Sequence, residues 1–128
     1  MLTNRLSGKR LDRQLARARA LRKRGRLHQA LNCYSHAMNA CGKNEEKRLC
    51  CLYLMAFTHV LIDHHEHHFN YLGADFRHHH KSQLEHAYEC LKLIDMDHFN
   101  PKDYGLPALT RCEIKQVMAF RHPDEAVH

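Results

Sequence analysis

Residues 10–40 read RLDRQLARARALRKRGRLHQALNCYSHAMNA, and this stretch decides the fold. Residues 10–24 are rich in Leu, Ala and Arg, which favour helices. One apolar stripe runs along them at Leu11, Leu15, Ala18 and Leu21. Gly25 then ends the first helix, and residues 27–40 carry a second apolar face. Because only a short link joins the two segments, we expect an antiparallel helical hairpin.

The helical pattern continues after this hairpin. Asn44, followed by two glutamates, is typical of a helix N-terminus, where a side-chain oxygen caps the backbone and acids complement the helix dipole. Residues 47–62 are apolar on nearly every side, which indicates a buried central helix. Further helices are predicted over residues 84–96 and from Pro107 to residue 120.

The composition agrees with an all-helical fold. The 128 residues include five Gly and three Pro, too few for the frequent turns of an all-β protein. The longest apolar run, residues 49–62, is shorter than the roughly 20 residues of a membrane span. We therefore predict an all-α fold of stacked antiparallel hairpins with about five to six helices. It would form a single domain over residues 1–121, followed by a frayed tail at 122–128.

Residues 25–37, GRLHQALNCYSHA, resemble the second half of a tetratricopeptide (TPR) repeat. The family's turn glycine, its two small residues and its aromatic residue fall on Gly25, Ala30, Ala37 and Tyr34. The small residue and the large apolar residue of the preceding helix fall on Ala18 and Leu21. Physically, small residues let paired helices approach closely, and the aromatic ring fills the space toward the next hairpin.

The repeat over residues 11–44 departs from the family pattern at three positions. Gln14 stands in place of the family's Trp, Arg17 in place of a Leu, and Gly42 in place of the closing Pro. The resemblance implies two to three stacked hairpins, because such repeats bury their faces only against neighbours. It also implies binding of a peptide or partner protein in a concave groove.

The sequence allows more than one starting point for the second repeat. A partial match to the repeat lies at residues 69–94. Within residues 69–76, an aromatic residue, a Leu-Gly pair and a second aromatic residue follow the spacing of the family's first helix. In a competing assignment, residues 47–62 are the first helix of the second repeat. A plain helical bundle that shares this spacing by chance is a third interpretation.

Positive charge is concentrated near the start of the chain. Residues 1–26 hold ten of the twenty Lys and Arg and one acidic residue, whereas the whole chain carries +6. Such a cluster attracts an acidic protein or nucleic acid, or simply forms a solvated helix face. We predict a partner protein, with an acidic surface, bound by Arg13, Arg17, Arg24, Asn32 and Tyr34. Nucleic-acid binding is the alternative, although no aromatic residue among these arginines supports base stacking.

Histidine is the most unusual component. Nine of fourteen histidines lie between His59 and His86. A second alternative function is therefore metal binding or sensing, since neutral imidazole suits Zn, Ni or Cu. Two residues four apart on a helix can chelate one ion, and a second segment must complete the site. These candidate ligands are His64, His68, His78 and His80. A solvated His-rich stretch or a pH-sensitive patch explains the same residues.

The cysteines and the start of the chain bear on the expected cellular compartment. The six cysteines contain no C-x-x-C pair, and no secretory signal is recognisable, so we expect reduced, buried thiols in a cytoplasmic protein. The Arg-rich start also resembles a mitochondrial transit peptide, although the predicted hairpin begins inside it.

Phosphate-binding and nucleophile-elbow motifs are missing from the sequence. The prediction is a non-catalytic protein-interaction module, an adaptor, chaperone or assembly factor, whose exposed hairpin face would also allow a homodimer.

Overall fold

The computed structural model describes the backbone of residues 2–70, 76–110, 113, 115 and 117, and the side chains of residues 10–65, 83–110, 113, 115 and 117. These residues form helices and no strand, which confirms the all-α class. The elements are α1 (Leu2–Lys23), α2 (Leu27–Asn39), α3 (Glu45–Asn70), α4 (Phe76–Leu91) and the 3-10 helix η1 (Pro101–Tyr104). These are four α-helices, and the described residues 113, 115 and 117 are helical as well, so the predicted number of five to six helices stays a prediction.

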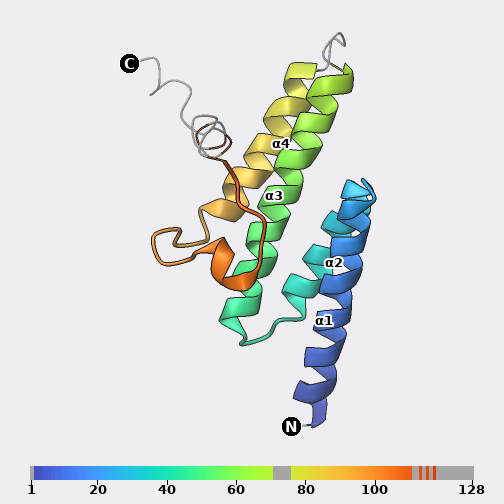
Figure 1. The fold of residues 1–128 in the computed structure, drawn as a ribbon, viewed down its shortest axis with the longest axis vertical. Coiled ribbons are helices and arrows are strands. Elements are labelled where there is room, and N and C mark those ends of the chain that lie inside the picture. Colours follow the sequence, from blue (N-terminus) through green and yellow to red (C-terminus); the bar gives the residue numbers. More distant parts are fainter. Residues whose placement is uncertain (1, 71–75, 111–112, 114, 116, 118–128) are drawn as a thin grey trace.

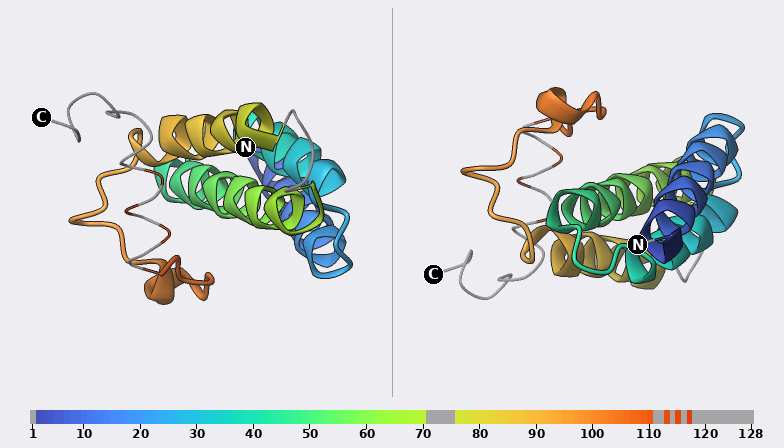
Figure 2. Two further views of the ribbon diagram at one scale, coloured as in Figure 1. Left: turned by 90° about the horizontal axis from the view of Figure 1, so that it is seen from above. Right: turned by 90° about the horizontal axis from the view of Figure 1, so that it is seen from below.

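The helices form two antiparallel pairs, α1 with α2 and α3 with α4 (Figure 1). Helix α3 packs against both α2 and α4 and so joins the pairs. Both end-on views in Figure 2 show α1, α3 and η1 toward one side and α2 and α4 toward the other. The predicted hairpin of the first two helices is therefore confirmed.

The signals that end and start the early helices work as predicted. Gly25 has φ +80°, a left-handed conformation that glycine adopts without steric cost, and it lies in the turn between α1 and α2. The Asn44 side chain accepts a hydrogen bond from the Lys47 backbone N–H at 3.2 Å, which caps α3. Helix α1, however, begins at Leu2, well before residue 10.

Two predictions for the middle of the chain are wrong in their boundaries. Helix α3 continues to Asn70 and α4 begins at Phe76, so Phe69 and Asn70 belong to one helix and Phe76 to another. Residues 71–75 lie outside the described residues. This division favours residues 47–62 as the first helix of the second hairpin. Helix α4 also ends at Leu91 rather than residue 96, beyond which Leu93 is 57% exposed.

The last predicted helix starts later than expected. Pro107 is not helical, whereas residues 113, 115 and 117 are. The hydroxyl of Thr110 accepts from the backbone N–H of Glu113 at 3.0 Å, and the Glu113 carboxylate accepts from the backbone N–H of Thr110. This capping box fixes the helix start at Thr110, because it satisfies N–H groups that the first turn leaves unpaired. The predicted boundary at residue 121 and the tail lie outside the described residues.

The core gathers around α3. Ala18 of α1 and Ala30 and Tyr34 of α2 are fully buried and belong to one apolar cluster with residues of α3 and α4. Residues 50–63 of α3 are all buried or partly buried, as the apolar pattern predicts. Their burial on several sides requires both hairpins and the C-terminal segment as cover.

Tyr53 of α3 holds that C-terminal segment in place. Its hydroxyl donates to the carbonyl oxygen of Pro107 at 2.7 Å and accepts from the backbone N–H of Leu109 at 2.9 Å. The side chain is only 1% exposed, and its ring lies 5.7 Å from that of Phe99. One buried hydroxyl thus satisfies two backbone groups that would otherwise be left without partners.

We expect Tyr53→Phe to lower the free energy of unfolding by about 1–3 kcal/mol, because the Leu109 N–H loses its acceptor inside the protein. Urea denaturation followed by circular dichroism measures this. The matched control is Tyr104→Phe, which removes a hydroxyl from an exposed ring and should change stability by no more than about 0.5 kcal/mol. Equal effects of the two substitutions would contradict the anchoring role of Tyr53.

Candidate functional site

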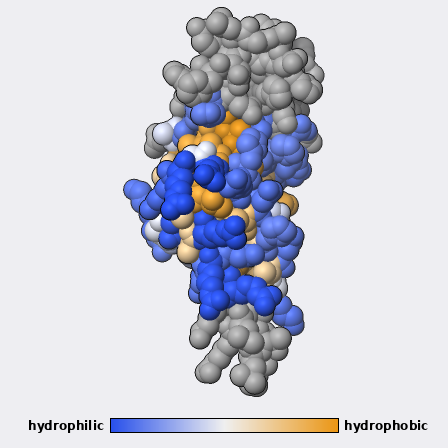
Figure 3. Space-filling view, turned by 90° about the vertical axis from the view of Figure 1, so that its right-hand side faces the viewer, coloured by the Kyte–Doolittle hydropathy of each residue, from blue (hydrophilic) through white to orange (hydrophobic). Residues whose placement is uncertain are grey.

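The exposed side of α1 and the turn that follows it carry unpaired positive charge. The exposed cationic side chains are Arg10, Arg13, Arg17, Arg19, Lys23, Arg24 and Arg26. None of them forms an ion pair in the part of the chain that the structure describes. Figure 3 shows the corresponding face as mostly hydrophilic, with apolar surface visible between the polar side chains. Charges without partners remain available to an anionic ligand.

Two contacts connect α1 to α3. The ammonium group of Lys47 lies 3.1 Å from the carboxylate of Asp12. The guanidinium of Arg22 lies 5.3 Å from the ring centre of Phe57, in cation–π range. Because the ion pair is largely exposed, it contributes between about 0 and 1 kcal/mol and acts mainly to orient the two side chains.

A small hollow opens between α1, α3 and the segment that follows η1. We call it the α1–α3 groove. Its lining consists of Leu15, Arg19, Glu46, Lys47, Cys50, Leu54, Tyr104 and Leu106. The buried members are apolar side chains and a thiol, whereas Arg19, Glu46 and Tyr104 are exposed. The groove therefore has an apolar floor and a polar rim.

The volume of the groove limits its ligand. It measures about 140 Å³, close to the roughly 150 Å³ of an apolar cavity that accepts benzene. Sites for cofactors and drug-sized molecules are typically about 300–1,000 Å³. One leucine- or phenylalanine-sized side chain thus fits the groove.

The C-terminal wall of the groove is supported from behind. The ring of Tyr104 stacks on Phe99 with centroids 5.2 Å apart, and Phe99 in turn packs against Tyr53. The same Tyr53 hydroxyl holds the backbone beside Leu106. The wall is therefore an ordered part of the core and not a free loop.

The predicted partner-binding residues do not line this groove. Arg13, Arg17, Arg24 and Asn32 are exposed and accessible. Tyr34 is 0% exposed, so its ring belongs to the core and offers no surface to a partner. The packing against α3 explains this, since the ring fills space between the two hairpins.

Arg19, Lys47 and Tyr104 line the groove and were not predicted from the sequence. Arg19 has one local signal, because it follows the apolar Leu15 by four residues and so shares its side of α1. Tyr104 has none, since its neighbours in the groove are remote in sequence.

The predicted metal ligands are only partly placed. His64 is half-exposed, and its Nε2 lies 3.3 Å from the carboxylate of Glu113. The side chains of His68, His78 and His80 lie outside the described residues. Among described side chains, no group of three or more His, Cys, Asp or Glu is arranged to hold a metal ion.

The structure instead pairs two other histidines of the predicted cluster. The rings of His59 on α3 and His86 on α4 stack with centroids 5.1 Å apart, and His59 Nδ1 lies 2.8 Å from the Gln83 side-chain oxygen. Burial lowers the pKa of His59, and the positive charges of His86 and His28 lower it further, while the bond to Gln83 opposes them. The environment between α3 and α4 thus favours the neutral form of His59 over the charged one.

Comparison with known proteins gives no relative: no family model, no curated protein and no solved structure matches the chain. Across the described residues, none of the helices combines the length and apolar character needed to cross a bilayer.

The lowered pKa of His59 predicts a loss of stability in acid. Unfolded His59 titrates near 6.5, so its contribution is complete above that pH and disappears as the pH falls through the lower folded pKa. The free energy of unfolding should therefore fall between pH 7.5 and 5, and His59→Gln should show a smaller fall. His36→Gln, at an exposed position, is the control and should behave as the wild type does. An undiminished fall in His59→Gln would show that other groups cause it.

Proposed function

We propose that this protein is a non-catalytic interaction module that binds an acidic segment of a partner protein at the α1–α3 groove. The observation that carries the proposal is an apolar hollow for one side chain beside a row of unpaired cations on α1. Binding modules commonly join an apolar anchor to polar contacts that fix register.

The contacts suggest how such a segment would bind. A Leu or Phe side chain of the partner would enter between Leu15, Leu54 and Leu106. An adjacent carboxylate would pair with Arg19, whose guanidinium has no ion-pair partner in the described part of the chain. The further arginines of α1 would speed association by long-range attraction and contribute less to the bound complex.

The arrangement of the hairpins supports a TPR-like module as the architectural basis of this function. The small residues Ala18, Ala30 and Ala37 are fully buried where the resemblance requires close helix approach. Helices α1 and α3, the first helices of the two hairpins, lie on one side (Figure 2). Residues of both helices line the groove. The family assignment itself stays a proposal.

The row of unpaired arginines also favours a second candidate, binding to the phosphate backbone of nucleic acid. The two candidates differ in what the groove contributes. Binding of a phosphate backbone depends on the total positive charge and not on the apolar floor of the groove. Binding of an acidic partner segment depends on the positive charge and on the apolar floor.

The test uses a displayed library of random twelve-residue peptides, selected against the full chain at physiological salt. We expect enriched peptides to carry one large apolar residue flanked by Asp or Glu. Arg19→Glu should weaken binding of a labelled enriched peptide by tenfold or more, measured by fluorescence anisotropy, because the carboxylate would then meet a like charge.

Arg13→Glu is the matched control, since it changes the same charge on the same helix outside the groove. It should weaken binding only a few-fold through reduced long-range attraction. Equal losses for both variants, together with tight binding of a labelled 20-base DNA duplex that weakens steeply with salt, would favour nucleic acid. Enrichment of basic or wholly polar peptides would contradict the proposal.

A further inference from the structure

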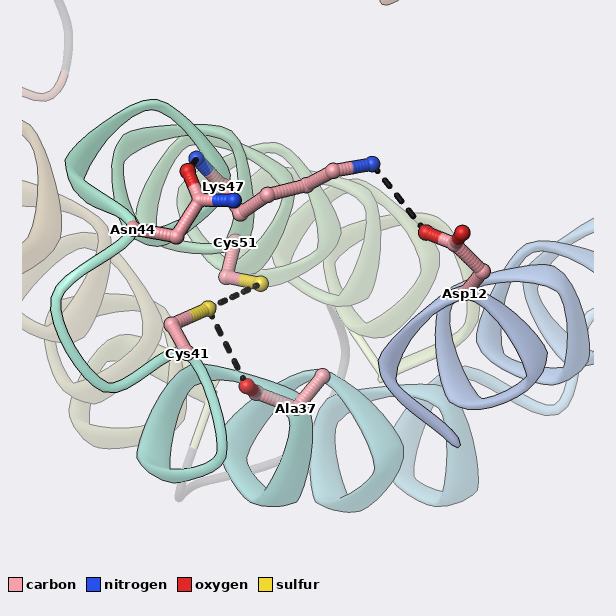
Figure 4. A network of polar contacts seen from close by, with 6 residues as sticks. All are labelled: Asp12, Ala37, Cys41, Asn44, Lys47 and Cys51. Atoms are coloured by element: carbon pink, nitrogen blue, oxygen red, sulfur yellow. Dashed lines mark hydrogen bonds and ion pairs between the residues drawn. The ribbon is translucent and has the colours of Figure 1, made fainter. Parts of the chain in front are cut away.

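Two buried thiols meet where α2 is joined to α3. Cys41 follows the end of α2, and Cys51 lies in the second turn of α3. Their sulfur atoms are 3.9 Å apart, and the side chains are 7% and 0% exposed (Figure 4). The five cysteines whose side chains the structure describes are all free thiols.

The surroundings of the pair are apolar and come from three helices. Leu11 of α1 and Ala37 of α2 belong to the same buried cluster, with Leu15 packed against it. The Cys41 thiol also lies 3.2 Å from the Ala37 carbonyl oxygen and donates a hydrogen bond to it. The neighbouring Cys50 does not share this cluster, since it lines the α1–α3 groove. Adjacent helix positions therefore place the two thiols in different environments.

We propose that Cys41 and Cys51 form an oxidisable dithiol that closes to an intramolecular disulfide in the presence of a peroxide. The sulfurs must approach from 3.9 Å to about 2.05 Å. A displacement of this size is comparable to that produced by rotation about the Cα–Cβ bonds of the two side chains. The inference stands on this geometry and does not depend on the proposed function.

The chemistry requires one equivalent of peroxide. Cys41 is the more exposed thiol, so it reacts first. Its sulfur, as the thiolate, attacks one oxygen of hydrogen peroxide, the O–O bond breaks, and a sulfenic acid and water form after proton uptake. The Cys51 sulfur then attacks the sulfenic sulfur, the S–O bond breaks, and the hydroxyl leaves as a second water with the thiol proton. Two thiols are oxidised to a disulfide while the peroxide is reduced to two waters.

Burial sets the rate of this reaction. It raises the pKa of Cys51 to about 12, and the nearby Cys41 contributes in the same direction. Because the thiolate is the nucleophile in thiol chemistry, the closing step is slow at neutral pH and faster in mild alkali. The pair is therefore inert to weak oxidants and responds to a sustained oxidising exposure.

The disulfide would tie the end of α2 to α3 beneath the groove. Leu15 packs on the dithiol cluster and also lines the groove. A bond between α2 and α3 would therefore fix the position of α2, on which α1 packs.

The test treats the reduced full chain with hydrogen peroxide at pH 8, alkylates the remaining thiols and maps disulfides by mass spectrometry without reduction. Trypsin leaves Cys33 with Cys41 and Cys50 with Cys51 on single peptides, so fragment ions must assign the bond. We expect a loss of about 2 Da per chain and a Cys41–Cys51 linkage in most molecules.

Two variants test whether the disulfide joins Cys41 to Cys51. A chain with Cys33→Ala and Cys50→Ala should still form the bond, whereas Cys41→Ala should lose it while keeping its helical circular-dichroism spectrum. Linkage through Cys33 or Cys50, or irreversible oxidation of Cys41 without a disulfide, would overturn the proposal. So would full recovery of both thiols after an exposure that oxidises the half-buried Cys33.

Discussion

A helix that is apolar on nearly every side must be covered on nearly every side, and α3 imposes this constraint on the whole chain. Ten of the fourteen residues 50–63 are buried and the other four partly buried, and the buried ones include the polar Thr58 and Asp63. No single neighbour can cover such a helix, so α2, α4 and the segment after η1 each take one side. Thr58 avoids an unpaired hydroxyl by bonding the Leu54 carbonyl oxygen of its own helix.

The candidate site is a consequence of that covering. The segment after η1 covers α3 from one side and α1 approaches it from another, and the space they leave is the α1–α3 groove. Its apolar floor is therefore the edge of the core, and its charged rim comes from Arg19 of α1 and from Glu46 and Lys47 in the first turn of α3. The two properties used in the proposed function, apolar volume and unpaired charge, thus have separate structural origins.

The sequence predicted what depends on neighbouring residues. Gly25, Asn44 and the stripe beginning at Leu11 specify the first hairpin and the start of α3, because stop, cap and periodicity are local signals. The apolar pattern does not fix the end of α3 at residue 70, since histidines replace it there, although the pairing of His64 with His68 assumes a helix across them. Thr110 and Glu113 have the spacing of a capping box, which is a local sequence signal, whereas the prediction places the helix start at Pro107.

The groove could not be predicted in this way. It joins Leu15, Cys50 and Leu106, and no periodicity relates positions so far apart in sequence. Tyr53 illustrates the same limit, because it pairs with backbone groups more than 50 residues further along the chain. The ring of Tyr34 is buried against α3, in agreement with the space-filling position implied by the resemblance, and this leaves it no surface for the partner contact predicted for the same residue.

The width of the groove depends on how α1 is held relative to α3. Helix α1 packs along α2, and α2 along α3, whereas α1 meets α3 through buried apolar side chains such as Leu11 and Ala18 and through the pairs Lys47–Asp12 and Arg22–Phe57. The exposed ion pair contributes little free energy, so it cannot by itself hold two helices at a fixed separation. The separation of α1 from α3 therefore depends on the apolar packing of both helices, to which the contact of α2 with α3 contributes. The sulfur atoms of Cys41 and Cys51 lie at that contact, which is why a bond between them would act on the groove without entering it.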